Sequence, residues 1–199
     1  KNHAVYFVPG LHRGLRVLEI VAAARRPLSI TEIASELGLT RSSVFRLIYT
    51  LRHMGFLEEE QSKQFALGPR VLNIGFAFLA SKDIIEIARP ELEALRDETL
   101  VSAHLAIRDE RDVLYLSCVQ TRSGFLSNMN VGSRVPAYAS PMGWLLLAGL
   151  PQAELEELFR KERFVPLTSQ TPTSTPELIA TVEAAAARGH VVSRGVMEA

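Results

Sequence analysis

Apolar residues recur at intervals of three and four along the first 55 residues, which is the spacing of amphipathic helices. Three segments show it: 9–26, 29–38 and 40–54. Ser29 and Glu32 give the second segment a capping-box pattern, and Thr40 can cap the third. Two short runs that are typical of hairpin strands follow, 56–60 and 64–68. Because only Gly38-Leu39-Thr40 separates the last two helices, the pattern predicts a helix-turn-helix with a wing behind it.

The rest of the chain alternates between helical and strand periodicity. Residues 71–81 predict a linker helix, and Pro90 predicts a break or kink in its continuation because proline removes a helical hydrogen bond. Strands are expected within 102–120 and 124–136, and helices within 140–151, 151–162 and 171–189. Thr175 is the expected cap of the last helix and Gly189 its stop. The final residues, 190–199, look like a strand that enters a loop.

These patterns together predict an α+β protein with three parts. Residues 1–70 are expected to form the winged helix-turn-helix, residues 71–82 a linker and dimerisation helix, and residues 83–199 an α/β domain. Phe76 and Phe78 on the linker helix are candidates either for packing within the chain or for contact between subunits. Because no element closes the last domain, we expect it to be incomplete at its C-terminal end.

The distribution of charge changes this picture more than the net charge of zero does. Residues 1–70 carry ten basic and six acidic side chains, a net charge of +4, whereas residues 71–199 carry twelve and sixteen, a net charge of −4. A basic front part is expected if only that part contacts a polyanion.

The single cysteine excludes an intrachain disulfide, and no segment is typical of a signal peptide or a membrane span. We therefore expect a cytoplasmic protein.

The outward face of the third predicted helix carries the candidate chemistry. With Val44 and Ile48 turned inward, Phe45 and Arg46 lie on the outward face of the helix. This mixture of aromatic and basic side chains is unusual for a face that contacts only water. In a DNA major groove, Arg46 can donate two hydrogen bonds to guanine, and Phe45 can contact a thymine methyl. Hydroxyls and backbone N–H groups at the start of the second helix can bind phosphate. The candidate contacts to double-stranded DNA are Ser29, Thr31, Thr40, Arg41, Ser42, Ser43, Phe45, Arg46, Tyr49, Arg52 and Lys63. A solvated helix face is the alternative, and the acidic run at 58–60 is expected to face away from DNA.

Three stretches of the chain resemble the isocitrate-lyase-regulator (IclR) family of bacterial transcription factors. They are VPGLHRGLRVLEIVA (8–22), LSITEIASELGLTRSSVFRLIYTLRHMGFLEEE (28–60) and VGSRVPAYASPMGWLLLAGLP (131–151). The resemblance extends from about residue 8 to the end of the sequence. It implies a DNA-binding repressor or activator with a C-terminal GAF-like domain that binds a small effector. It also implies a homodimer or homotetramer, with the contact between subunits in residues 71–81.

The same resemblance indicates where an effector would bind. Where the family has small residues followed by Gly-Lys, this chain has Pro141, Met142 and then Gly143-Trp144, and Pro141 removes a backbone donor. Acidic residues of the family are replaced by Ser193 and Arg194, which implies a more apolar pocket and an aromatic or other apolar organic acid. The candidate effector residues are Cys118, Leu126, Asn128, Val131, Gly132, Tyr138, Ala139, Pro141, Met142, Ser193 and Arg194. Met142 and Trp144 are also candidates for the core.

The alternative function is a small hydrolase or thiol enzyme with an accessory helical domain. It would require a nucleophile such as Cys118 with His104 as its base, but neither residue lies in a catalytic motif, and a small buried residue is the simpler interpretation of Cys118. The five histidines and one cysteine show no zinc-ligand spacing. We therefore expect neither an enzyme nor a bound metal or cofactor. A winged helix that binds protein instead of DNA is a third alternative.

Overall fold

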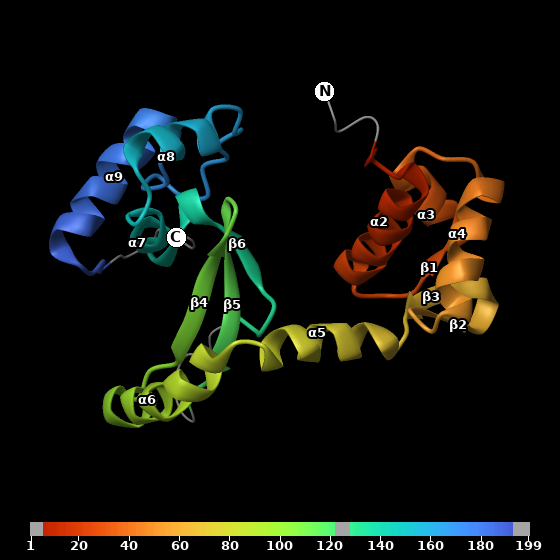
Figure 1. The fold of residues 1–199 in the computed structure, drawn as a ribbon, viewed down its shortest axis with the longest axis horizontal. Helices are drawn as coiled ribbons and strands as arrows, with labels where there is room; N and C mark the ends of the chain where they lie inside the picture. The colour runs from red at the N-terminus through yellow and green to blue at the C-terminus, as the bar shows by residue number, and fades with distance from the viewer. Residues whose placement is uncertain (1–5, 122–127, 193–199) are drawn as a thin grey trace. The chain divides into compact units, whose positions relative to one another are not determined.

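The computed structural model describes residues 6–121 and 128–192 of the 199-residue chain. They form two compact units, Lys1–Ser81 and Lys82–Ala199, called here the N-terminal unit and the C-terminal unit (Figure 1). The N-terminal unit contains α2 (Pro9–Ala24), β1 (Leu28–Ser29), α3 (Ile30–Leu37), α4 (Arg41–His53), β2 (Leu57–Glu60), η1 (Gln61–Lys63), β3 (Gln64–Leu67) and α5 (Arg70–Ala80). The C-terminal unit contains α6 (Asp83–Thr99), β4 (Ala103–Asp109), β5 (Asp112–Val119), β6 (Arg134–Pro136), η2 (Ala137–Ala139), α7 (Pro141–Leu147), α8 (Gln152–Phe159) and α9 (Thr175–Arg188).

Helices α2, α3 and α4 pack around one apolar core in the N-terminal unit. The buried side chains of this core are Val17, Val21, Leu28, Ile33, Ala34, Val44, Ile48, Leu57 and Phe65. The turn between α3 and α4 begins at Gly38, whose φ of 63° is a left-handed conformation that glycine adopts without steric cost. The predicted helix-turn-helix is therefore confirmed.

The wing is a three-stranded antiparallel sheet in the order β1-β3-β2. The hairpin of β2 and β3 was predicted, whereas β1 was not. A two-residue strand is too short to show an alternating pattern, and β1 exists because Leu28 pairs with Phe65. Leu57 and Phe65 are buried, so the inner face of the wing belongs to the same core as the helices.

The helix is not broken at Pro90, which contradicts one of the two predicted outcomes, whereas the other, a kink, stays a prediction. Helix α6 runs through Pro90 from Asp83 to Thr99, and the helical stretch is interrupted instead between α5 and α6, where Lys82 has a φ of −114° and a ψ of 86°. Proline at position 90 removes the hydrogen bond to the carbonyl of Glu86. Both residues are exposed, so water can satisfy this carbonyl and the helix continues.

The C-terminal unit is built on the antiparallel sheet β4-β5-β6. The long hairpin of β4 and β5 was predicted, and Glu110 makes its turn with a φ of 53°. Two details differ from the prediction. The cap of α9 is Ser174, whose hydroxyl accepts a hydrogen bond from the backbone N–H of Glu177, and not Thr175. Residues 191 and 192 are irregular, not a strand, and residues 193–199 lie outside the described residues.

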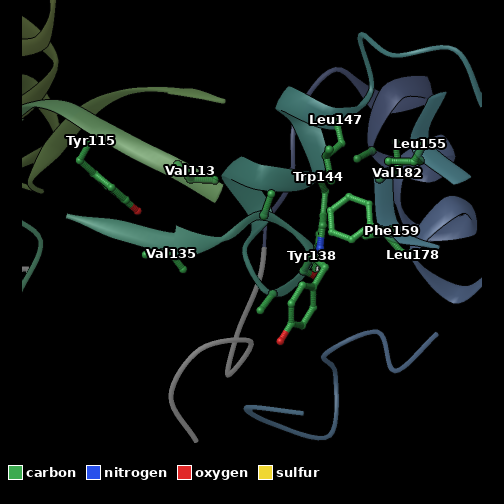
Figure 2. Close-up of a cluster of buried hydrophobic side chains, with 13 residues drawn as sticks. Val113, Tyr115, Val135, Tyr138, Trp144, Leu147, Leu155, Phe159, Leu178 and Val182 are labelled. Atoms are coloured by element: carbon green, nitrogen blue, oxygen red, sulfur yellow. Dashed lines mark hydrogen bonds between the residues drawn. The ribbon is translucent and has the colours of Figure 1, made fainter. Parts of the chain in front are cut away.

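The core of the C-terminal unit lies where α7, α8 and α9 pack beside the hairpin (Figure 2). Trp144 is 7% exposed and donates a hydrogen bond from Nε1 to the carbonyl of Tyr138 at 2.7 Å, so the core alternative for Trp144 is confirmed. Gly143 permits the close approach of α7 to η2, because a Cβ at this position would lie 2.1 Å from the carbonyl oxygen of Ala137. Glycine is therefore required at position 143 by packing.

Candidate nucleic-acid interface and effector site

Helix α4 is held in place by its cap and by its buried stripe. The hydroxyl of Thr40 accepts a hydrogen bond from the backbone N–H of Ser43 at 3.3 Å, which satisfies one of the free donors at the helix start. Val44 is fully buried and Ile48 is 2% exposed. With these two side chains in the core, the rotation of the helix is fixed, and so is the face that it presents outward.

That outward face combines aromatic rings with cations. Phe45 is 54% exposed and Tyr49 is 60% exposed, and their ring centroids lie 6.4 Å apart. The side chains of Arg41, Ser42 and Arg46 are exposed beside them. Covering two neighbouring aromatic rings with a partner surface would remove apolar area from water, which is favourable. This face is the strongest candidate for an interface in the N-terminal unit.

On the side of α4 that faces the wing, the basic side chain is paired with an acidic one. Arg52 donates a hydrogen bond to Glu59 of β2, so this candidate DNA contact is already paired with a carboxylate of the acidic run. Both side chains remain partly exposed. Lys63 is exposed in η1 between the two wing strands, and it has a φ of 57°. The structure therefore leaves Lys63 more accessible than Arg52 to a phosphate.

The start of α3 is a complete capping box. Ser29 accepts a hydrogen bond from the backbone N–H of Glu32 at 3.3 Å, and the Glu32 carboxylate accepts from the backbone N–H and the hydroxyl of Ser29 at 2.8 and 2.7 Å. Arg26 donates to the same carboxylate at 2.8 Å. These hydrogen bonds lower the pKa of Glu32 from 4.5 to about 2, with the backbone of Ser29 as the largest cause. Thr31 is exposed in the same turn, whereas the Ser29 hydroxyl serves the cap.

The capping box predicts an acid-dependent loss of stability in the N-terminal unit. Because the folded pKa of Glu32 lies below the unfolded value, its contribution is complete above about pH 4.5 and is lost as the pH falls toward about 2. Glu32→Gln should flatten this part of the pH profile, since glutamine can occupy the same capping position without titrating. The measurement is thermal unfolding followed by circular dichroism over this pH range. Glu36→Gln, which removes one charge from the same helix, is the control, and identical profiles for the two variants would contradict the prediction.

Predicted effector residues of the sheet and the following loop lie on and beside β5. Cys118 is half-buried and lies directly opposite His104 in the antiparallel register of β4 and β5. Asn128 and Val131 are exposed, and Gly132 has a φ of 86°, which confirms its predicted turn. The backbone N–H of Gly132 donates to the carbonyl of Tyr115 at 2.8 Å. The loop therefore runs along the edge of β5.

The predicted effector residues around α7 are divided between core and surface. Ala139 is fully buried. Tyr138 packs edge-on against Phe159 and Phe164, and its hydroxyl accepts a hydrogen bond from the backbone N–H of Val165 at 3.0 Å. Pro141 and Met142 are half-buried and retain surface for a ligand. Three further candidates, Leu126, Ser193 and Arg194, lie outside the described residues.

Both units match models of one protein family. Residues 10–61 match the IclR helix-turn-helix domain, and residues 76–197 match the C-terminal domain of the bacterial transcriptional regulator IclR. The chain belongs to the IclR family. The resemblance stated from the sequence is therefore confirmed, and so is the fold class of an N-terminal helix-turn-helix with a C-terminal α/β domain.

Individual IclR-family proteins show how far the similarity extends. The Pca regulon regulatory protein of Pseudomonas putida is 30% identical over 187 residues, which cover 94% of this chain and 64% of that protein. The crystal structure of an IclR transcriptional regulator from Alicyclobacillus acidocaldarius has a TM-score of 0.82 and 25% identity, covering 97% of this chain and 78% of the other. An IclR homologue from Microbacterium hydrocarbonoxydans, crystallised with 4-hydroxybenzoate, has a TM-score of 0.79 and 24% identity over 95% and 78% of the two chains. The chain thus spans about two thirds of the length of the Pseudomonas putida regulator and 78% of each of the two crystallised chains.

Two features of this IclR-family chain depend on contacts that its sequence does not reveal. The pairing of Arg52 with Glu59 requires the wing to fold back onto α4, so no local pattern reveals it. The burial of His104 depends on the register of β4 and β5.

Within residues 6–121 and 128–192, no group of three or more His, Cys, Asp or Glu side chains is arranged to hold a metal ion. Nor is any helix of these described residues long and apolar enough to cross a membrane.

Proposed function

We propose that this protein is an operator-binding transcriptional regulator that reads double-stranded DNA with α4. The observation that carries the proposal is the exposed aromatic and basic face of a rigidly capped α4 within an IclR-family helix-turn-helix. In this proposal, Arg46 would donate to a guanine edge, and Phe45 would contact a thymine methyl. Thr31 and the first turn of α3, with Lys63 on the wing, would contact phosphates. Arg41, Ser42, Ser43 and Tyr49 complete the surface.

The C-terminal unit is proposed to bind a small organic acid. The Microbacterium homologue was crystallised with 4-hydroxybenzoate, and the residues of this chain along β5 and α7 offer aromatic and sulfur-containing walls, namely Tyr115, Cys118 and Met142. An aromatic acid matches such walls better than a small polar acid does. The effector would act by binding two arrangements of the subunits with different affinity, which shifts their populations and changes operator affinity.

Helix α5 is proposed to join two subunits. It carries Leu72, Ile74, Phe76 and Phe78, and none of its residues is buried in the described part of the chain. A helix that exposes several large apolar side chains has a strong tendency to associate, because burying these side chains removes apolar area from water. A homodimer, or a tetramer built from dimers, would present two copies of α4 to two half-sites of an operator.

The dimer predicts a large effect of a charge on α5. Phe76 is 59% exposed in the single chain, and Phe76→Glu should raise the dimer dissociation constant at least about 100-fold, because each subunit loses about 1.5–3 kcal/mol of apolar burial and the dimer loses about twice that. The measurement is sedimentation velocity over a range of protein concentrations. Asn73→Ala on the same helix is the control and should leave the dimer intact. Unchanged association of the Phe76→Glu variant would place the interface elsewhere.

The alternative of a thiol enzyme has less support. Burial raises the pKa of the Cys118 thiol, which favours the protonated and unreactive form, and burial lowers the pKa of His104. A nucleophilic cysteine requires the opposite environment, with a nearby cation that stabilises the thiolate. We therefore propose a regulator without catalytic activity that acts in the bacterial cytoplasm, where the operator DNA is.

The decisive experiment is a titration of the purified full-length protein against its own upstream DNA at two salt concentrations, with scrambled DNA as the control. A regulator should prefer its own sequence, and its affinity should fall steeply with salt, with a slope of about −0.9 for each phosphate contact. Repeating the titration with aromatic acids tests the effector. Equal, salt-insensitive affinity for both DNAs, with and without these acids, would overturn the proposal.

A further inference from the structure

His104 occupies a distinctive position in the sheet of the C-terminal unit. It lies on β4 opposite Cys118 of β5, and its ring meets the ring of Tyr115 edge-on at a centroid distance of 5.6 Å. A register shift between Leu105 and Ala106 aligns Ala106 with Tyr115. His104, Ala106, Tyr115 and Cys118 therefore share one face of the sheet, the face that packs against the core of this unit.

The Nδ1 atom of His104 is enclosed and has no hydrogen-bond partner. Among the described residues it is the only enclosed side-chain nitrogen or oxygen in this situation. Buried polar atoms are nearly always satisfied, so an exception calls for an explanation. Nε2, by contrast, makes no hydrogen bond among the described residues and is not one of the enclosed atoms without a partner, so it keeps some exposed surface on this half-buried residue. The ring thus has one sheltered nitrogen and one that can meet a ligand.

The protonation of the ring follows from this environment. Burial lowers the pKa of His104, so the imidazole is neutral near pH 7 and carries a single proton. An enclosed N–H without an acceptor is less favourable than an enclosed lone pair, so the proton resides on Nε2. His104 therefore presents a neutral N–H donor at the accessible edge of its ring.

The neighbours of this donor are also uncharged. Burial raises the pKa of the Cys118 thiol, and burial together with Cys118 raises the pKa of the Tyr115 hydroxyl, so both groups stay protonated near neutral pH. None of the ion pairs among the described residues includes His104. A carboxylate placed here would lose hydration without gaining a counter-charge from the described neighbours of His104, whereas an uncharged oxygen loses much less.

We propose that His104 donates a hydrogen bond from Nε2 to an uncharged oxygen substituent on the ring of an aromatic acid effector, a phenolic hydroxyl above all. The carboxylate of the effector binds away from His104. This inference rests on the proposed function, in which the C-terminal unit binds such an acid. It assigns His104 as the residue that selects hydroxylated over plain aromatic acids.

A comparison of two ligands and four proteins tests this assignment. Binding of 4-hydroxybenzoate and of benzoate to the full-length protein is measured by calorimetry for the wild type, His104→Leu, His104→Gln and His104→Asn. The wild type should prefer 4-hydroxybenzoate by roughly 3- to 10-fold, the range of one hydrogen bond. His104→Leu should remove this preference and leave benzoate affinity unchanged. His104→Gln should retain it because its amide nitrogen reaches the position of Nε2, and His104→Asn should not, because its amide reaches only the position of Nδ1.

The possible outcomes separate the inference from the function on which it rests. If the wild type binds both acids equally, or if His104→Leu weakens both acids equally, the assignment of His104 is overturned while aromatic-acid binding stands. If the wild type binds neither acid, the aromatic-acid effector is overturned together with the role of His104. Thermal unfolding of each variant checks the fold, and His104→Leu should not be destabilised, since it removes an unsatisfied buried atom.

Discussion

Arg46→Ala is expected to lower specific operator affinity by about 10- to 100-fold for each half-site, while the fold and effector binding are retained. Arg46 is exposed on α4 and has no ion-pair partner among the described residues, so its removal leaves the N-terminal core intact. A guanidinium that donates two hydrogen bonds to one guanine provides specificity as well as affinity. The loss should therefore be much larger on the operator than on scrambled DNA.

The measurement is fluorescence anisotropy with labelled operator and labelled scrambled DNA at two salt concentrations. Arg13→Ala is the matched control: it removes the same charge from the same unit, but from α2, which packs on the buried side of α4. A phosphate contact would show itself differently, as a similar loss on both DNAs and a shallower salt slope. Operator affinity that survives Arg46→Ala unchanged would refute the assignment of α4 as the recognition helix.

Gly143→Ala is expected to destabilise the C-terminal unit by about 3 kcal/mol or more, at the upper end of overpacking in a protein core. The added Cβ would lie 2.1 Å from the carbonyl oxygen and 2.5 Å from the Cα of Ala137. Both atoms belong to the backbone of η2, so no side-chain rotation can relieve the overlap. Helix α7 must move away from η2, which would also separate Trp144 from the carbonyl of Tyr138.

The chain provides its own probe for this experiment. Its single tryptophan, Trp144, is buried next to the substituted position, so its fluorescence during urea unfolding reports on the C-terminal unit (Figure 2). Gly149→Ala is the control, because its nearest neighbour, the carbonyl oxygen of Leu146, would lie at 3.9 Å from the new Cβ. This variant should change the free energy of unfolding by less than about 1 kcal/mol. Similar unfolding curves for the two variants would show that α7 tolerates the shift.

The steric constraint on Gly143 cannot be recognised from the sequence alone. Gly143 follows Pro141 and Met142 in a helical stretch, where glycine normally weakens the helix, and nothing local distinguishes it from Gly149. The difference between the two arises from the backbone of Ala137, which packs against α7 after the chain has turned through Ser140. Sequence spacing shows that α7 forms, but the distance between α7 and η2 is a property of the packed unit.

Local patterns by themselves determined the helix-turn-helix. The stripes of α2, α3 and α4, the caps at Ser29 and Thr40, and the glycine stop at Gly38 depend on residues within a few positions of one another, so the sequence displays them directly. The same holds for the β4–β5 hairpin and for Gly132 and Gly189, whose positive φ values serve turns. These features also led to the family, because the motifs that define it are local.

Only the tertiary structure decided the features that join distant residues or depend on solvent. Strand β1 forms because β3 offers it a partner, and Pro90 is tolerated because its helix is exposed to water. Arg52 meets Glu59 through the return of the wing. The register of β4 and β5 set His104 opposite Cys118 and enclosed one nitrogen of its ring. A shift of one residue in this register would turn His104 to the other face, since side chains alternate along a strand, and no local pattern specifies that choice.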